Sequence, residues 1–271
     1  MNLASAGWIG RTRPDKPEAM ARYDFRTPRL FLDATLAAGS EVALEREQAN
    51  YLLNVLRLKP GGDVLVFNGR EGEWRAQLAA SGRKGAKLGI LDRTREQTTA
   101  PDLHYLFAPL KHARLDYMVQ KAVEMGAARL QPVLTRHTQA ERVNLARMRA
   151  NAIEAAEQCG ILNVAQVAEP VKFGEFARGW TADRVLIFCD EDAGVKDPIA
   201  ALLAARGGGI AGPSPVSVLI GPEGGFAEQE RETRSKLPNV IRLALGPRIL
   251  RADTAAVAAL SLVQAVLGDW R

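Results

Sequence analysis

Two apolar runs near the end of the chain, each stopped by a Gly-Pro pair, constrain the fold more than any other feature of the sequence. Residues 216–220 run into Gly221-Pro222, and residues 241–245 run into Gly246-Pro247. Short apolar runs bounded by turn residues are typical of strands buried in a parallel sheet. Proline ends such strands because it donates no ladder hydrogen bond. Glycine loops at neighbouring strand ends face each other, so this pair predicts a flat slot for a small ligand.

Upstream of these runs, apolar segments of strand length alternate with longer segments of helical periodicity. The expected strands are 103–108, 130–134, 185–189, 216–220 and 241–245, and the expected helices are 115–125, 144–158, 198–205, 227–237 and 254–267. Such alternation predicts an α/β fold with a parallel sheet covered by helices on both faces.

The N-terminal part of the chain follows a different pattern. Its expected strands are 29–32, 63–68, 73–79 and 87–92, with a helix at 47–55 and a glycine turn at 69–72. Short strands joined by glycine turns predict a small β-barrel. The stretch before it is rich in proline and charge without periodicity, which predicts a poorly ordered extension. The expected division is therefore an extension at 1–27, a barrel at 28–98 and an α/β domain at 99–271, with a polar linker at 94–101.

The net charge, the cysteine content and the lack of a long apolar stretch indicate which partners and which cell compartment suit this protein. The net charge is +5, and residues 1–98 hold 16 lysines and arginines against 12 aspartates and glutamates. A basic N-terminal part permits nucleic-acid binding. The two cysteines, Cys159 and Cys189, form neither a disulfide framework nor a zinc spacing, which favours a reducing cytoplasm. No apolar stretch is long enough to span a bilayer, so we expect no membrane contact.

Several motifs occur together in the order of one known family. LIGPEGGF at 219–226 and LGPRILRADTA at 245–255 resemble the C-terminal signature of the RsmE family, SPOUT-class methyltransferases that methylate N3 of one uridine in 16S ribosomal RNA. Further motifs of that family are similar to the segments 111–114 with 119–126, 157–160, and 51–57 followed by 60–63. The resemblance covers roughly residues 28–271. Ile161 stands where the family commonly has arginine, and Asp253, which we expect to cap the last helix, replaces a glutamate.

The resemblance implies a fold, a cofactor and partners. It implies a PUA-like RNA-binding barrel, a SPOUT domain with a deep trefoil knot, and a cytoplasmic homodimer acting on 16S ribosomal RNA or the assembled small subunit. It implies S-adenosylmethionine as methyl donor, S-adenosylhomocysteine as product and no metal. The residues it implies for cofactor binding are Leu219, Gly221, Pro222, Glu223, Gly224, Gly225, Leu243, Leu245, Gly246, Ile249 and Leu250.

The methyl acceptor sets a second requirement. Loss of the N3 proton builds negative charge on N3 and the flanking carbonyl oxygens, which a nearby cation stabilises. Arg251 is the first candidate, before Arg136 and Arg248, and the alternative role of each is a phosphate contact or a surface charge. Glu223 is the candidate proton acceptor or a cofactor contact. The expected RNA-binding residues are Arg29, Arg57, Lys111, Arg114 and Arg248.

Other features have a structural interpretation. We expect Asp190-Glu191-Asp192 to be a solvated turn, His137 to be structural, and Cys159 to be a small buried residue. Gly207–Gly212 matches a dinucleotide-binding spacing, but it follows an expected helix, so we interpret it as a flexible loop. Two alternatives for function stay open: a methyltransferase for another RNA or base atom, and a non-catalytic RNA-binding or ribosome-assembly protein. The intact glycine loops argue against the second.

Overall fold

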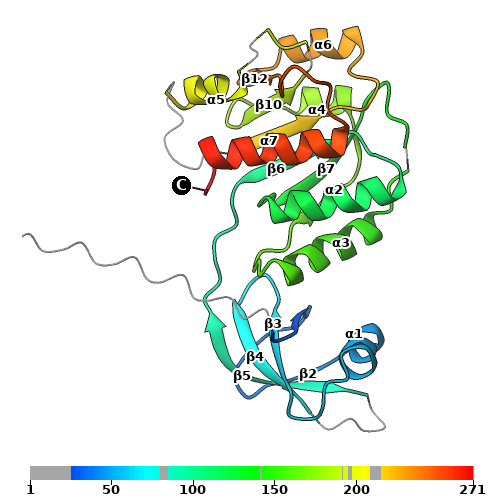
Figure 1. The fold of residues 1–271 in the computed structure, drawn as a ribbon, viewed down its shortest axis with the longest axis vertical. Helices are drawn as coiled ribbons and strands as arrows, with labels where there is room; N and C mark the ends of the chain where they lie inside the picture. Colours follow the sequence, from blue (N-terminus) through cyan, green and yellow to red (C-terminus); the bar gives the residue numbers. More distant parts are fainter. Residues whose placement is uncertain are drawn as a thin grey trace, which may run out of the picture.

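A parallel sheet forms the centre of the larger, C-terminal part of the protein (Figure 1). The computed structural model describes residues 26–79, 85–140, 142–190, 192–194, 197–207 and 215–270, so most of the expected extension and of the Gly207–Gly212 motif lies outside the described residues. The strand order is β12-β10-β11-β6-β7-β8, with every pair parallel, and β9 also pairs with β7. The strands are β6 (Leu103–Phe107), β7 (Arg129–Leu134), β8 (Gln166–Val167), β9 (Val171–Lys172), β10 (Val185–Cys189), β11 (Val216–Ile220) and β12 (Val240–Leu243).

Helices cover both faces of this sheet, as the alternation predicts. They are α2 (His112–Glu124), α3 (Leu145–Gln158), α4 (Phe173–Arg178), α5 (Pro198–Gly207), α6 (Glu228–Ser235) and α7 (Ala252–Val266). Helix α7 packs against β11, between α2 and α5, while α4 packs against α6 on the other side. Strand β11 is buried along its whole length because both of its faces are covered. Within the part of the chain that the structure describes, no helix has the length and apolar character needed to cross a bilayer.

The smaller sheet is formed by the N-terminal part of the chain. Its order is β1-β3-β4-β5-β2, with β1 parallel to β3 and the other pairs antiparallel. The elements are β1 (Arg29–Phe31), β2 (Glu41–Ala43), α1 (Arg46–Asn50), η1 (Tyr51–Val55), β3 (Asp63–Phe67), β4 (Glu73–Leu78) and β5 (Lys87–Arg95). Gly69 and Gly72, at φ 81° and 82°, form the turn between β3 and β4. The sequence predicts a small β-barrel here, and among the described residues the strand pairings form a series with β1 and β2 at its ends.

Arg29 joins the two parts of the protein. Its Nε donates to Glu73 at 2.7 Å, and its other nitrogens donate to the carbonyl oxygens of Ala156 and Ile161 at the end of α3. The guanidinium also lies 3.8 Å from the centre of the Phe67 ring. Arg29 is only 7% exposed, so the prediction that it contacts RNA is wrong. Its donors are used inside the protein, because a buried cation needs both a counter-charge and hydrogen-bond acceptors.

Candidate functional site

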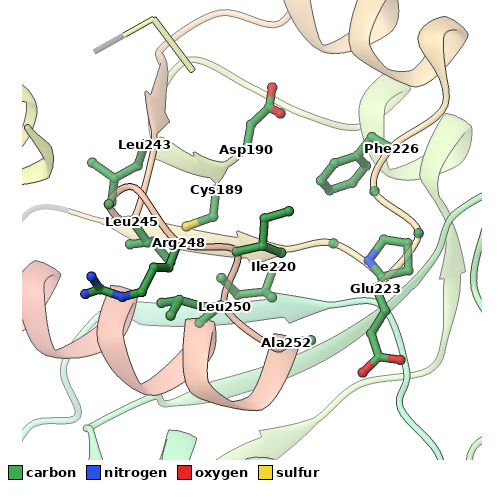
Figure 2. A pocket seen from close by; sticks show the side chains of 17 residues that line it. Cys189, Asp190, Ile220, Glu223, Phe226, Leu243, Leu245, Arg248, Leu250 and Ala252 are labelled. Carbon is green, nitrogen blue, oxygen red and sulfur yellow. The ribbon is translucent and has the colours of Figure 1, made fainter. Parts of the chain in front are cut away.

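The two glycine loops meet at the carboxyl edge of the parallel sheet and enclose a pocket of about 280 Å³ (Figure 2). We call residues 221–227 the first loop and residues 244–251 the second loop. Residues from both loops, together with residues at the ends of β10, β11 and β12 and at the start of α7, line the pocket. Of the residues predicted to bind cofactor, those at the pocket are Gly221, Pro222, Glu223, Gly224, Gly225, Leu243, Leu245, Gly246, Ile249 and Leu250.

Leu219 is the exception among the predicted pocket residues. It is fully buried and belongs to the apolar cluster on the α4–α6 face of the sheet, with Phe188 and Phe226. Successive side chains of a strand point to opposite faces, so Ile220 lines the pocket instead. The prediction for Leu219 is therefore wrong. Cys189, Asp190 and Phe226 are further pocket residues that the sequence interpretation missed.

The first loop is folded tightly around Phe226. The Gly225 N–H donates to the Pro222 carbonyl at 2.9 Å, and Gly225 has a φ of 67°, which favours glycine. A Cβ on Gly221 would lie 2.5 Å from the Phe226 ring, so glycine is needed there for close packing. The ring itself is held by Phe188, with 4.4 Å between ring centres. The backbone of the first loop is therefore fixed by its own packing.

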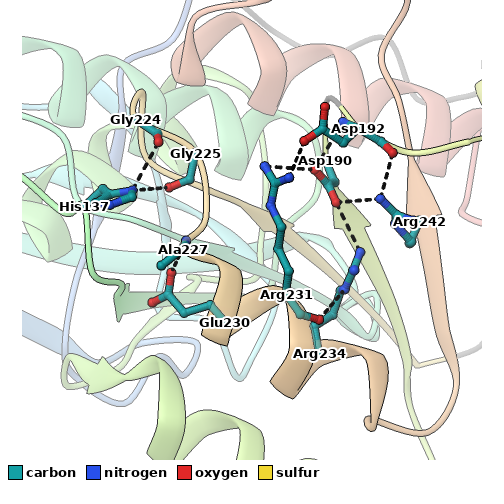
Figure 3. Close-up of polar contacts among 10 residues, drawn as sticks. All are labelled: His137, Asp190, Asp192, Gly224, Gly225, Ala227, Glu230, Arg231, Arg234 and Arg242. Carbon is teal, nitrogen blue, oxygen red and sulfur yellow. Dashed lines mark hydrogen bonds and ion pairs between the residues drawn. The ribbon is translucent and has the colours of Figure 1, made fainter.

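His137, which follows β7, and Glu230 of α6 hold the first loop from outside (Figure 3). The His137 Nδ1 lies 3.1 Å from the carbonyl oxygens of both Gly224 and Gly225. Because carbonyl oxygens only accept, Nδ1 carries the proton in this arrangement. The Glu230 carboxylate accepts from the backbone N–H of Ala227 at 2.9 Å and of Arg136 at 2.8 Å. His137 thus has the structural role that the sequence predicts.

Arg114 connects the first loop to the start of α7. Its guanidinium donates to both carboxylate oxygens of Asp253, at 3.0 and 3.2 Å, and to the Glu223 carboxylate. This hydrogen bonding lowers the pKa of Asp253, and the two carboxylates raise the pKa of Arg114. Arg114, predicted to bind RNA, is thus engaged by two protein carboxylates. Asp253 lies in the first turn of α7, and the N-cap residue is Arg251 instead.

The second loop makes fewer contacts with the rest of the protein. Gly246 has a φ of 107°, and a Cβ there would meet no atom within 4 Å. Ile249 is 90% exposed although it borders the pocket, and Arg248 on the rim is exposed as well. Arg251 is exposed next to the pocket and makes no ion pair with the described residues, but it is not among the lining residues. This loop presents cations without burying them.

The structure also places the other residues for which the sequence predicts a role. The Arg136 side chain is exposed and does not line the pocket, so the structure shows no contact between this candidate and the pocket. Arg57 is exposed just after η1, beside the smaller sheet. Lys111 is exposed at the N-cap of α2, beside the first loop. Cys159 is exposed, so the prediction that it is buried is wrong.

Asp190 forms a buried charged cluster behind the pocket (Figure 3). Its side chain is fully buried, and its carboxylate lies 3.1 Å from Arg234, 2.9 Å from Arg242 and 3.7 Å from Arg231. The prediction of a solvated turn is therefore wrong for Asp190. Burial, followed by the charge of Arg242, lowers the pKa of Arg234. Since α6 follows the first loop and β12 precedes the second, Asp190 fixes both loops to the end of β10.

The lining determines which ligands the pocket suits. Ile220, Leu243, Leu245 and Leu250 form an apolar wall, and the glycines leave backbone groups accessible at its edge. Among the described residues, no three histidines, cysteines or acidic residues are placed to hold a metal ion. Burial raises the pKa of the Cys189 thiol to about 12, so it stays protonated and is a poor nucleophile. The pocket therefore suits a flat, partly apolar organic molecule held by backbone contacts.

Comparisons with known proteins agree with this arrangement. Residues 97–264 match the RNA methyltransferase domain family, and residues 44–91 match the RNA methyltransferase PUA domain. The ribosomal RNA small subunit methyltransferase E of Rickettsia conorii is 26% identical, over 87% of this chain and 94% of the relative. The enzyme of that name from Synechocystis is 31% identical, over 83% and 73%. A crystal structure of the Neisseria gonorrhoeae enzyme of that name, bound to S-adenosylmethionine, superposes with a TM-score of 0.77 at 28% identity, covering 90% of this chain and all of the other.

Proposed function

This chain belongs to the RNA methyltransferase domain family, and on that premise we propose that it methylates N3 of one uridine in 16S ribosomal RNA of the small subunit. The observation that carries the proposal is the pocket between the two glycine loops. Every residue expected to bind the cofactor lines it except Leu219, and a similar structure was crystallised with S-adenosylmethionine. The smaller sheet overlaps the match to the RNA methyltransferase PUA domain, which supports an RNA substrate.

The residues present fit S-adenosylmethionine. The wall of Ile220, Leu243, Leu245 and Leu250 suits a flat adenine ring, and the backbone of the two loops can read its edge. Glu223, at the border of the pocket, carries the negative charge that a sulfonium would attract. When bound, this cofactor supplies an electrophilic methyl group without help from a metal.

The chain's own residues have to manage the proton and the charge of the acceptor. N3 of uridine carries a proton that leaves as the methyl group arrives, and Glu223 is the carboxylate at the border of the pocket that can accept it. Arg251 and Arg248 are exposed on and beside the second loop, where they can neutralise charge on the base carbonyls or on RNA phosphates. Arg136 stays a candidate for the same role, although it lies outside the pocket lining.

Finer features of the family belong to the same proposal. After β12 at the sheet edge, the chain returns to the centre as α7, between α2 and α5, which supports the deep trefoil knot. Ile249, almost fully exposed on the rim, offers an apolar contact to a second copy, which supports a homodimer. We propose a cytoplasmic enzyme whose RNA-binding domain covers residues 28–98 and whose methyltransferase domain covers residues 99–271.

Modification mapping of 16S ribosomal RNA tests the reaction. A methyl group on N3 blocks Watson–Crick pairing, so reverse transcriptase stops beside it. RNA from cells without the gene should lose one such stop. Wild-type protein should restore it, and the Arg251→Ala variant should restore it less or not at all. An identical stop pattern in cells with and without the gene would exclude 16S ribosomal RNA as the substrate.

A further inference from the structure

A second cavity adjoins the cofactor pocket at the first loop. Its volume is about 170 Å³, and it shares Pro222 and Glu223 with that pocket. The rest of its wall is formed by the segment between β6 and α2, which includes Lys111, by Arg114 in the first turn of α2, and by Gln139 from beyond β7. Figure 2 shows the Glu223 carboxylate pointing away from Asp190 and Phe226, and Glu223 lines both spaces. The two spaces therefore meet at Pro222 and Glu223.

The polar groups of this cavity match one edge of one base. The Lys111 ammonium and the Gln139 amide are exposed and make no side-chain hydrogen bond with the rest of the described chain. Both can donate, and the Glu223 carboxylate accepts. The Watson–Crick edge of uracil reads carbonyl, N–H, carbonyl, which pairs with a donor, an acceptor and a donor. Pro109, Leu110 and Pro222 provide apolar surface for the ring faces.

From this match we infer that the cavity is the acceptor site, where the uracil of the target nucleotide binds with N3 toward Glu223. The inference rests on the proposed function and names the subsite that serves it. Cytosine has an unprotonated N3 in place of the N–H, so it would present a lone pair to the carboxylate and be rejected. The proton leaves N3 for the Glu223 carboxylate. With the cofactor bound, the electron pair left on N3 would bond to the methyl carbon while the bond from that carbon to sulfur breaks, and its electron pair would stay on the sulfur of S-adenosylhomocysteine. Arg114 stays in place because Asp253 still holds it on two sides.

A basic groove continues from the cavity and suits the backbone of a flipped nucleotide. It shares Leu110, Lys111 and Gln139 with the cavity and extends to Arg142, which precedes α3, and to Arg147 in the first turn of α3. Arg147 is paired with Asp116 at 2.6 Å. Lys111 and Arg142, by contrast, make no ion pair with the described residues. A base that reacts on its Watson–Crick edge has to leave its helix, which leaves its phosphates outside the base site. The groove is where those phosphates bind.

Kinetics on small subunits purified from cells without the gene test the acceptor site. Lys111→Ala and Gln139→Ala should each lower kcat/KM by about 10²-fold, because donors aimed at developing charge contribute that much. The dissociation constant of S-adenosylmethionine, measured by calorimetry, should change less than about twofold because neither residue lines its pocket. Lys236→Ala is the matched control, since Lys236 is exposed at the end of α6, away from both cavities.

Two further readouts separate this role from a general loss of structure. The Glu223→Gln variant should regain activity as pH rises, about tenfold per pH unit, because solvent base then replaces the carboxylate. Arg142→Ala should reduce the slope of log KM against log salt by about one, as expected for one lost phosphate contact. Wild-type turnover with unchanged kcat/KM in both Lys111→Ala and Gln139→Ala would overturn the acceptor site and leave the proposed function standing. No methylation by the wild-type enzyme would overturn both.

Discussion

The two loops around the pocket arise from similar sequence patterns, but they are held in opposite ways. The first loop is fixed by His137, by the Glu230 carboxylate, by Arg114 and by the Phe226 ring packed against Gly221. The second loop exposes Ile249 and has free space beside Gly246. The first loop is therefore held in place before any ligand binds, whereas the second loop gains most of its contacts from the ligand. Preorganisation on one side lowers the entropy lost on binding, while an open side lets the ligand enter and leave.

Asp190 should give the largest effect, because it supports both loops. Asp190→Asn leaves the buried Arg234 without its counter-charge, and breaking such a pair costs about 3–5 kcal/mol. Urea unfolding should show that loss, and S-adenosylmethionine affinity should fall with it. The control is Asp192→Asn, since Asp192 is 61% exposed and its pair with Arg231 is worth about 1 kcal/mol or less. Equal stability of the two variants would show that the cluster does not hold the loops.

Gly221→Ala should have the second-largest effect, because it adds an atom inside the tightly packed first loop. The new Cβ would lie 2.5 Å from the Phe226 ring, which is itself confined by Phe188. Overpacking of this kind costs about 1–3 kcal/mol. Thermal unfolding and calorimetric cofactor binding should both be impaired. Wild-type values for both would mean that the first loop is more adaptable than its contacts indicate.

Gly246→Ala, the matching change in the second loop, should have a smaller effect. No atom lies within 4 Å of the new Cβ, so only the backbone strain at φ 107° remains, about 1 kcal/mol. The same two measurements apply. If this variant loses as much stability as Gly221→Ala does, the contrast between a packed loop and an open loop fails.

Acid should release the link between the first loop and α7, with the smallest effect on stability. Arg114 lowers the pKa of Asp253 below its ordinary value of 3.8, so the stabilisation is complete above that pH and is lost as the pH falls through the folded-state value. Urea midpoints of wild type and Asp253→Asn should differ at neutral pH and converge in acid. A constant difference at all pH values would mean that the carboxylate charge of Asp253 is not what holds Arg114.

The sequence predicts the layout of the α/β part because its strands and helices are long and strongly patterned. It misses β2, β8, β9 and α4, because elements of two to six residues carry too little periodicity to be seen. It also assigns Leu219 to the pocket in place of Ile220. A strand buried on both faces lacks the apolar–polar alternation that shows which side chains face which way.

The charged residues show a second limit on prediction from sequence. Arg29 is an arginine in a basic region, which in the sequence alone suggests an RNA contact. Its actual partners Glu73 and Ala156 lie far along the chain. Asp190 begins an acidic run that suggests a solvated turn. In the fold, Arg234 from α6 and Arg242 from β12 contact its carboxylate. The sequence shows which residues are charged. Only the tertiary fold shows whether a charge is buried in an ion pair inside the protein or exposed to solvent. The glycine loops were predictable because their role depends on backbone conformation, which local sequence does encode.

The buried Arg29 junction gives the molecule a fixed reach. Swinging the smaller sheet away from α3 would strand a guanidinium that now contacts Glu73, Ala156 and Ile161 at once. The buried junction therefore keeps the distance between that sheet and the pocket fixed. An RNA that touches both ends has to offer its two contact points at that span, which a folded RNA meets and a slack single strand meets only by losing entropy. Under the proposed function, part of the choice of target would then lie in the shape of the RNA, far from the reacting base.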